Sequence, residues 1–328
     1  MSSNQRPRVI CLRPRRDFDQ MGVEVPDDLD VAFYENEREL EAIGSGVLGL
    51  VLPSAGPALS SELLSDARDL AIVQYTGAGT DRINDEVIDD IGCAVCNVPG
   101  ASAPDVASYV AVATGVLLRN MITGDRLMKA GLFPEARSRM TPSLVRGYRG
   151  LRVGVVGFGS IGREVATTFH ALGAEVMWYD PQPAATDASG LFERVELDEL
   201  LERCEVLTVH VPLLESTRGL IDAAALARLH PGAIVVNAAR GGIIEEAALM
   251  DALDSSHLGG VVLDVFEVEP LPGSSALVAW AQRHADRVLL SPHIAGVTPE
   301  ASRVLFVEAW SNLRAVLLEG HAPRHRVR

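Results

Sequence analysis

A glycine-rich turn between an apolar run and a helical stretch is the feature that most constrains the fold. Leu151–Val156 leads directly into Gly157-Phe-Gly159-Ser-Ile-Gly162, where a helical pattern begins. This strand–turn–helix context is typical of a parallel α/β sheet that binds a dinucleotide. Gly157 would permit the tight turn, Gly159 would let a pyrophosphate approach the backbone, and Gly162 would let the helix pack on the strand. The first helical turn would present unpaired N–H groups to the phosphates.

An acidic residue follows the turn at the expected distance. Asp180 ends the next apolar run, 18 positions after Gly162. A carboxylate there accepts hydrogen bonds from a ribose 2′-hydroxyl and repels a 2′-phosphate, so the pattern favours NAD over NADP. We expect Ser160 and Ile161 to line the same cradle. The alternative is a glycine-rich turn that binds nothing.

Short apolar runs alternate with helical stretches along the whole chain, which predicts parallel α/β architecture. In the first part the expected strands are Val9–Leu12, Val31–Tyr34, Leu48–Leu52, Ala71–Tyr75 and Ala94–Asn97. The expected helices there are Ser60–Leu70 and the long apolar Pro104–Arg119. In the second part the expected strands are Arg152–Val156, Glu175–Tyr179, Val206–His210, Ala233–Asn237, Gly260–Asp264 and Val288–Ser291. The expected helices are Ile161–Leu172, Ala223–Leu229, Glu245–Leu253 and Pro299–Leu318.

Composition excludes several classes of protein. A formal charge of −15 argues against binding to nucleic acid, because phosphate backbones attract clustered Lys and Arg. We expect no membrane span, because no apolar run approaches about 20 residues. Four cysteines in 328 residues do not make a disulfide framework, which fits a reducing cytoplasm. Cys93 and Cys96 form a C-x-x-C, but a strand would turn them to opposite faces, so we expect no metal site.

Three polar motifs follow successive expected strands at the carboxyl edge of the second sheet. They are Asn237-Ala-Ala-Arg240, Asp264-Val-Phe-Glu-Val-Glu269 and Ser291-Pro-His293. An arginine fork can bind the carboxylate of a 2-oxo acid and polarise its carbonyl. Reduction at C2 builds negative charge on oxygen, which an imidazolium can neutralise with a proton. A carboxylate beside the imidazole would hold its tautomer and favour the charged form.

With the glycine-rich turn and His210-Val-Pro-Leu, these motifs resemble the D-isomer-specific 2-hydroxyacid dehydrogenase family, from about Leu50 to the C-terminus. The resemblance implies two doubly wound, Rossmann-like domains with a cleft between them. Residues 1–100 and 297–328 would form the substrate-binding domain, and 101–296 the NAD-binding domain. It implies hydride transfer between NAD and C2 of a small 2-hydroxy or 2-oxo acid. Arg240 would bind substrate, and His293 with Glu269 would form the acid/base pair.

The resemblance also nominates further site residues. Those expected near the cofactor, besides the glycine-rich turn and Asp180, are His210, Val211, Pro212, Thr217, Ala238, Ala239, Arg240, Asp264, His293 and Gly296. Those expected near the substrate, besides Arg240 and His293, are Ser54, Gly77, Ala78 and Gly79. For His210 the alternative is a histidine in the core at a strand end, and for Gly77–Gly79 it is an ordinary turn. The family implies a homodimer that pairs through Pro104–Arg119 and the segment up to Tyr148.

Three departures leave the substrate open. Pro53 stands where many relatives carry an arginine, Ser108 stands where they often carry a glutamate, and the segment 270–290 is longer and includes Trp280 and His284. An NAD-sensing corepressor on the same scaffold is one alternative function. A dehydrogenase for another small anion, such as formate or phosphite, is the other.

Overall fold

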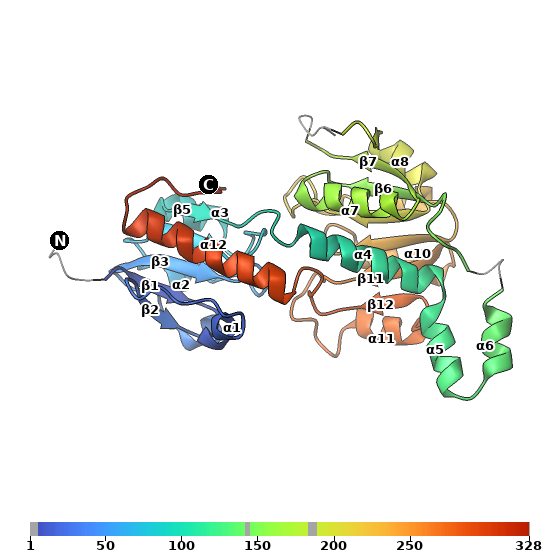
Figure 1. Cartoon of the computed structure of the whole chain (residues 1–328), viewed down its shortest axis with the longest axis horizontal. Coiled ribbons are helices and arrows are strands. Elements are labelled where there is room, and N and C mark those ends of the chain that lie inside the picture. Colours follow the sequence, from blue (N-terminus) through green and yellow to red (C-terminus); the bar gives the residue numbers. More distant parts are fainter. Residues whose placement is uncertain (1–5, 142–144, 183–188, 328) are drawn as a thin grey trace. The chain divides into compact units, whose positions relative to one another are not determined.

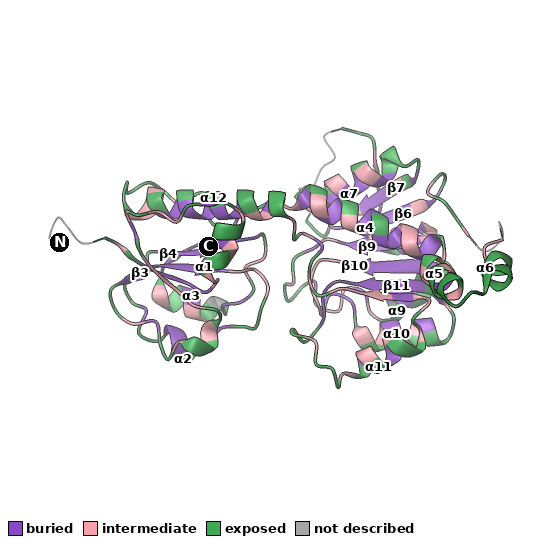
Figure 2. Cartoon of the chain, turned by 60° about the horizontal axis from the view of Figure 1, so that its bottom comes forward, coloured by how far each residue is buried: buried purple, intermediate pink, exposed green. Residues whose placement is uncertain are grey.

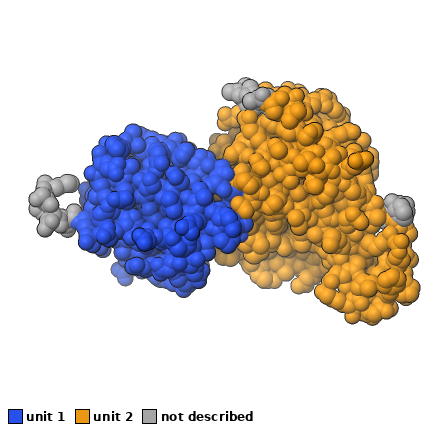
Figure 3. All heavy atoms as spheres, in the orientation of Figure 1, with its two compact units in different colours: residues 1–102, 297–328 blue, residues 103–296 orange. Residues whose placement is uncertain are grey.

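A computed structural model describes residues 6–141, 145–182 and 189–327. The chain forms two compact units, one of residues 1–102 with 297–328 and the other of residues 103–296 (Figure 3). Each unit is an α/β layer structure built on a parallel sheet (Figure 1). The α/β fold class expected from the sequence is therefore confirmed.

The first unit has a sheet of five parallel strands in the order β2-β1-β3-β4-β5. Its strands are β1 (Arg8–Cys11), β2 (Asp30–Phe33), β3 (Val47–Leu52), β4 (Ile72–Tyr75) and β5 (Ala94–Cys96). Its helices are α1 (Arg15–Gln20), the 3-10 turn η1 (Glu37–Glu39), α2 (Ser61–Leu64), α3 (Asp85–Ile91) and α12 (Pro299–Leu317). The sheet has a separate apolar core on each face.

The C-terminal helix α12 covers one face of this sheet, where Phe306 and Trp310 pack around Phe18. A buried polar contact ties it to the sheet, because Asn312 Nδ2 lies 2.7 Å from Gln74 Oε1. Cys93 lies in the core on the other face and Cys96 in the core beneath α12. The two thiols therefore face apart, as the strand pattern predicts.

The second unit has a sheet of seven parallel strands in the order β12-β11-β10-β9-β6-β7-β8. Its strands are β6 (Arg152–Val156), β7 (Glu175–Tyr179), β8 (Glu193–Arg194), β9 (Val206–Val209), β10 (Ala233–Asn237), β11 (Leu258–Leu263) and β12 (Val288–Leu290). Its helices are α4 (Ala103–Leu118), α5 (Met121–Lys129), α6 (Phe133–Arg139), α7 (Ser160–Ala171), α8 (Leu197–Arg203), α9 (Ala223–Arg228), α10 (Glu246–Asp254) and α11 (Ala276–Arg283). The central strands β9, β10 and β11 are buried (Figure 2).

The order of these strands reverses between β6 and β9. From β6 the chain proceeds outward through β7 to β8, and it then returns to place β9 on the other side of β6. In doubly wound sheets the crevice outside the carboxyl ends at such a reversal is where ligands bind. The segments that follow β6, β9, β10, β11 and β12 are therefore the place to look for a site.

Some elements differ from the sequence-based expectation. The helix expected over Ser60–Leu70 is only the single turn α2, because the Ser65 hydroxyl bonds back to the Glu62 carbonyl and the chain then continues in turns. The helices α5, α6, α8 and α11 were not expected. Residues 142–144, in the segment expected to pair two copies, lie outside the described residues.

Within the described chain, no single helix is both long and apolar enough to cross a membrane. The helices α4 and α5 reach that length and composition only when taken together, and they are bent by 61° at their junction.

Candidate functional site

The glycine-rich turn has the backbone that a phosphate cradle requires. Gly157 has φ +93°, and a Cβ there would lie 2.7 Å from the His210 carbonyl. At Gly162 a Cβ would meet the Gly157 carbonyl oxygen at 1.9 Å, so only glycine lets α7 start this close to β6. At Gly159, by contrast, a Cβ would meet no atom of the described residues within 4 Å. Two glycines thus serve packing, and the third faces open space where an anion has room.

The aromatic residue of the turn, Phe158, is fixed by packing. Phe158 is buried and stacks on Trp178 of β7, with ring centroids 4.1 Å apart. Among the described residues, no side chain caps the N-terminus of α7, where Ser160 and Ile161 lie. Backbone N–H groups in the first turn of an uncapped helix attract anions. The turn therefore fits the pyrophosphate of a dinucleotide.

Asp180 follows β7 and lies beside this turn. Its Oδ2 accepts a hydrogen bond from the Phe158 N–H at 2.6 Å, and its Oδ1 accepts one from the Gln182 N–H at 2.8 Å. Each carboxylate oxygen has a second lone pair with which to accept a ribose hydroxyl. The negative charge beside the turn opposes a 2′-phosphate.

The segment after β9 packs under the glycine-rich turn. Val211 is buried, with its Cγ1 2.8 Å from the Cβ that Gly157 lacks, and Pro212 is exposed. His210 Nε2 lies 2.8 Å from Thr208 Oγ1, and burial lowers the pKa of His210 to about 3, so the ring is neutral. Thr217 is buried and donates to the Pro212 carbonyl at 2.6 Å. The two polar side chains thus brace the loop, and contact with a cofactor remains a prediction for both.

The turn after β10 carries Arg240, and Asn237 shapes it. Asn237 is buried, its Nδ2 donates to the Arg240 carbonyl at 2.9 Å, and its Oδ1 accepts from the Ala239 N–H at 3.1 Å. Arg240 Nη1 donates to the Ala239 carbonyl at 2.7 Å. Asn237 belongs to the motif that follows the expected strand, but the sequence alone assigns it no role. Its place at the end of a buried strand is the signal that marks it.

A close approach of two backbones brings the Arg240 turn against the loop after β11. A Cβ at Gly241 would lie 1.9 Å from the Phe266 carbonyl oxygen, so only glycine fits. The Phe266 N–H in turn donates to Glu269 Oε1 at 3.0 Å. The positive charge of Arg240 also acts on the Glu269 carboxylate. Arg240 and Glu269 therefore belong to one cluster.

His293 completes that cluster. Its Nδ1 lies 2.8 Å from Glu269 Oε2, and both side chains are about a quarter exposed, at 25% and 22%. Burial raises the pKa of Glu269, but the hydrogen bond and charge of His293, with the Phe266 N–H and Arg240, lower it below its ordinary value overall. Glu269 is therefore ionised at neutral pH. With Nδ1 held by the carboxylate, Nε2 is the ring nitrogen that can exchange a proton with a substrate.

Asp264, at the end of β11, is completely buried. Its Oδ1 accepts from Ser291 Oγ at 2.6 Å and from the Ile294 N–H at 2.9 Å, and its Oδ2 accepts from the Ala295 N–H at 2.8 Å. The carboxylate thus organises the turn that carries His293. A contact between Asp264 and the nicotinamide carboxamide stays a prediction, as does one by Gly296.

The substrate residues expected in the first unit lie together at the carboxyl ends of β3 and β4. A Cβ at Gly77 would lie 2.3 Å from Ser54 Oγ, so the two residues touch. Ala78 accepts from Asn97 Nδ2 at 2.6 Å. Arg82 is buried and donates to the Pro57 carbonyl at 2.9 Å and to Glu37 Oε2 at 3.0 Å, which pins the loop that follows Ser54.

The structure shows the surroundings of two of the three departures from the family pattern. The extended segment 270–290 contains the helix α11, and Trp280 is buried in the core and bonded to Asp254 at 3.0 Å. His284 also bonds to Asp254, so this stretch stabilises the second unit. Ser108 Oγ donates to the Asp105 carbonyl of its own helix at 2.8 Å.

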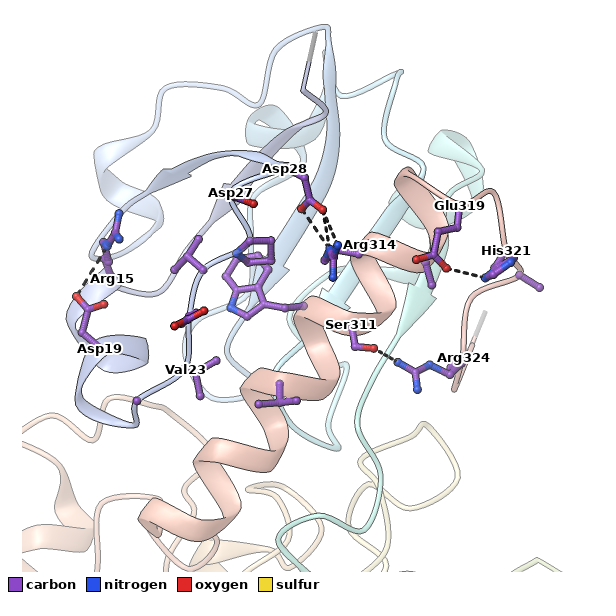
Figure 4. A pocket seen from close by; sticks show the side chains of 18 residues that line it. Arg15, Asp19, Val23, Asp27, Asp28, Ser311, Arg314, Glu319, His321 and Arg324 are labelled. Atoms are coloured by element: carbon purple, nitrogen blue, oxygen red, sulfur yellow. Dashed lines mark hydrogen bonds and ion pairs between the residues drawn. The ribbon is translucent and has the colours of Figure 1, made fainter. Parts of the chain in front are cut away.

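A groove of about 1220 Å³ in the first unit contains none of the predicted site residues. It lies between α12 and the segment Gly22–Asp28 (Figure 4). Most of its charged side chains pair with one another, as Asp28 does with Arg314 at 2.6 Å. In the described part of the chain, no group of three His, Cys, Asp or Glu side chains could hold a metal ion.

The known proteins that this chain resembles are dehydrogenases and a reductase. Residues 113–295 match the family described as D-isomer specific 2-hydroxyacid dehydrogenase, NAD binding domain. The chain is 36% identical over 292 residues to (S)-sulfolactate dehydrogenase of Chromohalobacter salexigens, covering 88% of this chain and 90% of that protein. It is 35% identical over 286 residues to hydroxypyruvate reductase of Thermotoga maritima, covering 86% and 89%. The apo structure of Rhodotorula graminis D-mandelate dehydrogenase superposes with a TM-score of 0.82 at 26% identity, covering 99% and 98%.

The Asp180 carboxylate should set the choice between the two nicotinamide dinucleotides. We expect wild-type protein to bind NADH at least tenfold more tightly than NADPH, and Asp180→Ala to narrow that ratio, because the ribose contact and the repulsion are both lost. Fluorescence titration measures both dissociation constants. Asp251→Ala, on the exposed surface of α10, is the control and should keep the wild-type ratio. Tighter NADPH binding by wild type would contradict the assignment.

Proposed function

This chain belongs to the D-isomer specific 2-hydroxyacid dehydrogenase family, and we propose that Arg240, Glu269 and His293 carry its reaction. It is an NAD-dependent oxidoreductase that moves a hydride between nicotinamide and C2 of a small 2-hydroxy or 2-oxo acid. The observation that carries the assignment of residues is the 2.8 Å contact between His293 Nδ1 and Glu269 Oε2, in the same cluster as Arg240.

The residues present fit the cofactor. The open space at Gly159, the uncapped start of α7 and the free lone pairs of Asp180 accommodate a pyrophosphate and a ribose. When bound, NADH supplies the hydride that reduces C2. We further propose that the backbone of Ala238 and Ala239 and the segment 210–217 line the remainder of the cofactor site.

Arg240 would orient the substrate. Its guanidinium presents a planar fork of donors that matches a carboxylate, and it can also polarise the neighbouring carbonyl oxygen. Asn237 holds the backbone of the turn from which this side chain extends. We propose that Ser54 and the backbone N–H groups of Gly77, Ala78 and Gly79 grip the substrate carboxylate.

His293 would supply the proton. During reduction negative charge develops on the C2 oxygen, and protonated Nε2 can donate to it. Nδ1 donates to the ionised Glu269 carboxylate, which fixes the orientation of the ring and leaves Nε2 for the substrate. In the oxidative direction neutral Nε2 would accept the hydroxyl proton.

The relatives argue against the other functions that the sequence left open. They are dehydrogenases and a reductase of 2-hydroxy acids, so neither a corepressor nor a formate or phosphite dehydrogenase is favoured. The acid pair adds a chemical reason, since oxidation of formate to CO2 releases a hydride but no hydroxyl proton for His293 to accept.

The identity of the acid is tested with a panel of substrates. Oxidation of NADH should be measured with glyoxylate, hydroxypyruvate, phosphohydroxypyruvate, pyruvate, sulfopyruvate and bulkier 2-oxo acids, and the configuration of the product determined. We expect at least one to be reduced to the D-hydroxy acid. No turnover with any 2-oxo acid in either direction would contradict the proposed function.

We also propose a homodimer that acts in the cytoplasm without binding nucleic acid or membranes. Large apolar side chains lie exposed along α4, α5 and α6, with Val112 67%, Met121 56% and Phe133 60% exposed. Sedimentation should give twice the mass of one chain, and Phe133→Glu should shift it toward the monomer because a charge would be buried. A monomeric wild type would contradict the dimer. Cell fractionation tests the cytoplasmic location. Titration with DNA or with lipid vesicles tests the proposed absence of binding to nucleic acid and to membranes.

Arg240→Lys should keep the charge but lose the two-pronged geometry. We expect kcat/KM on the best 2-oxo acid to fall about 10²-fold, because kcat falls and KM for the acid rises. The affinity for NADH should change little. Arg228→Lys replaces an arginine paired on the surface with Glu202 and should change neither constant. Wild-type efficiency in Arg240→Lys would show that this residue does not hold the substrate.

The pH dependence tests the acid pair. Reduction needs the protonated imidazole, so its rate should fall as pH rises, while oxidation should improve over the same range. In Glu269→Gln the rate of reduction should fall about tenfold or more across this pH range, because the ionised carboxylate that orients the His293 ring is gone. Glu267→Gln, an exposed neighbour, should leave the rate profile unchanged. Coincident profiles for wild type and Glu269→Gln would rule out the pair.

A further inference from the structure

We propose that Tyr109 of α4 is a positioning residue for His293, acting through Ser291 and the buried carboxylate of Asp264. The inference rests on the proposed role of His293. It concerns a side chain that touches neither the glycine-rich turn nor the Arg240 cluster in any contact described above.

A chain of hydrogen bonds joins α4 to the end of β11. The Tyr109 hydroxyl bonds to Ser291 Oγ, which lies 2.6 Å from Asp264 Oδ1. An ionised carboxylate only accepts, so Ser291 donates its single proton to Asp264. The Ser291 oxygen must then accept from Tyr109. Burial raises the pKa of Tyr109, which keeps the phenol protonated as that donor.

The far end of this chain is the turn that carries His293. The Asp264 carboxylate accepts from the N–H groups of Ile294 and Ala295, and the Asp264 carbonyl accepts from the His293 N–H at 2.8 Å. His293 itself has φ +56°, a left-handed backbone that a residue with a Cβ rarely adopts. Such a conformation persists when its surroundings fix it from several directions. Here Asp264 binds the turn on both sides of His293.

Loss of the Tyr109 hydroxyl would loosen this arrangement at its outer end. Ser291 would lose the donor that orients it, and its bond to Asp264 would no longer be held in one geometry. A small rotation of the turn would move His293 Nδ1 away from Glu269 Oε2, now 2.8 Å apart. Displacement of a reacting group by a fraction of an ångström reduces turnover more than it reduces binding.

The same helix offers a matched control. The Tyr148 hydroxyl donates to the Ala111 carbonyl of α4, and Tyr148 is half-buried like Tyr109. Tyr148→Phe therefore removes the same atom from a phenol packed on the same helix, and no hydrogen bond between described residues joins the Tyr148 hydroxyl to the His293 turn. A purely structural role for Tyr109 predicts that both variants behave alike.

The test combines steady-state kinetics with NADH titration. Tyr109→Phe should lower kcat for reduction about tenfold, with KM for the acid and the dissociation constant of NADH within twofold of wild type. Ser291→Ala should match it, and the double variant should be no worse than Ser291→Ala alone, because the two side chains act in series. Tyr148→Phe should keep wild-type kcat. An unchanged kcat in Tyr109→Phe, or equal losses in both tyrosine variants, would overturn the proposal.

A second readout does not require turnover. The Nδ1 proton of His293, bonded to Glu269, gives an NMR resonance that can be assigned by its absence in His293→Ala. We expect it to shift or broaden in Tyr109→Phe and to stay in place in Tyr148→Phe. If wild type reduced no 2-oxo acid, the proposed function would fail while this resonance still decided the positioning role. An identical resonance in all three proteins would overturn that role.

Discussion

Parallel pairing of β6, β9, β10 and β11 is the constraint on which the site depends. Because these strands run in one direction and lie side by side, the segments that follow them must emerge at one edge of the sheet. The glycine-rich turn, the Arg240 turn and the Glu269 loop are three such segments. Residues far apart in sequence, such as Gly157 and His210, thereby become neighbours.

Glycines and buried polar groups then convert proximity into a fixed geometry. Gly241 lets the Arg240 turn touch the Phe266 carbonyl, and Gly162 lets α7 start against Gly157. The buried Asp264 carboxylate is a costly group to desolvate, and its three hydrogen bonds to the His293 turn offset that cost. The turn thereby places Nδ1 of His293 against the Glu269 carboxylate and leaves Nε2 to exchange a proton with the substrate.

Much of this could be predicted from the sequence because buried parallel strands appear as continuous apolar runs bounded by turn residues. The strands β6, β7 and β10 have the predicted bounds, and the fold class follows from the alternation of strand and helix. The short helix α11 was not predicted, because its apolar residues Leu277 and Trp280 occupy only one side of two turns within a segment rich in proline and glycine. Long, strongly patterned elements were predictable, and short surface ones were not.

The candidate site, too, could be predicted only in part. The proximity of Arg240, Glu269 and His293 could be predicted because each lies in a segment that follows a strand at the same edge of the sheet. Their roles in the reaction stay predictions. Asn237 and Ser291, which bear on them, could not be assigned roles, because those roles depend on contacts that only the folded chain reveals. For Asp264 the family resemblance implies a role toward the cofactor, whereas its contacts in the structure lie with the His293 turn.

We propose that His293 donates the proton during reduction and that binding of NADH does not depend on its side chain. Comparing His293→Ala with wild type, by single-turnover reduction of the best 2-oxo acid and by NADH titration, tests this most directly. We expect reduction to be roughly 10²–10⁴-fold slower in the variant, the usual span for a positioned acid, with NADH affinity nearly unchanged. Reduction at the wild-type rate in His293→Ala would contradict it.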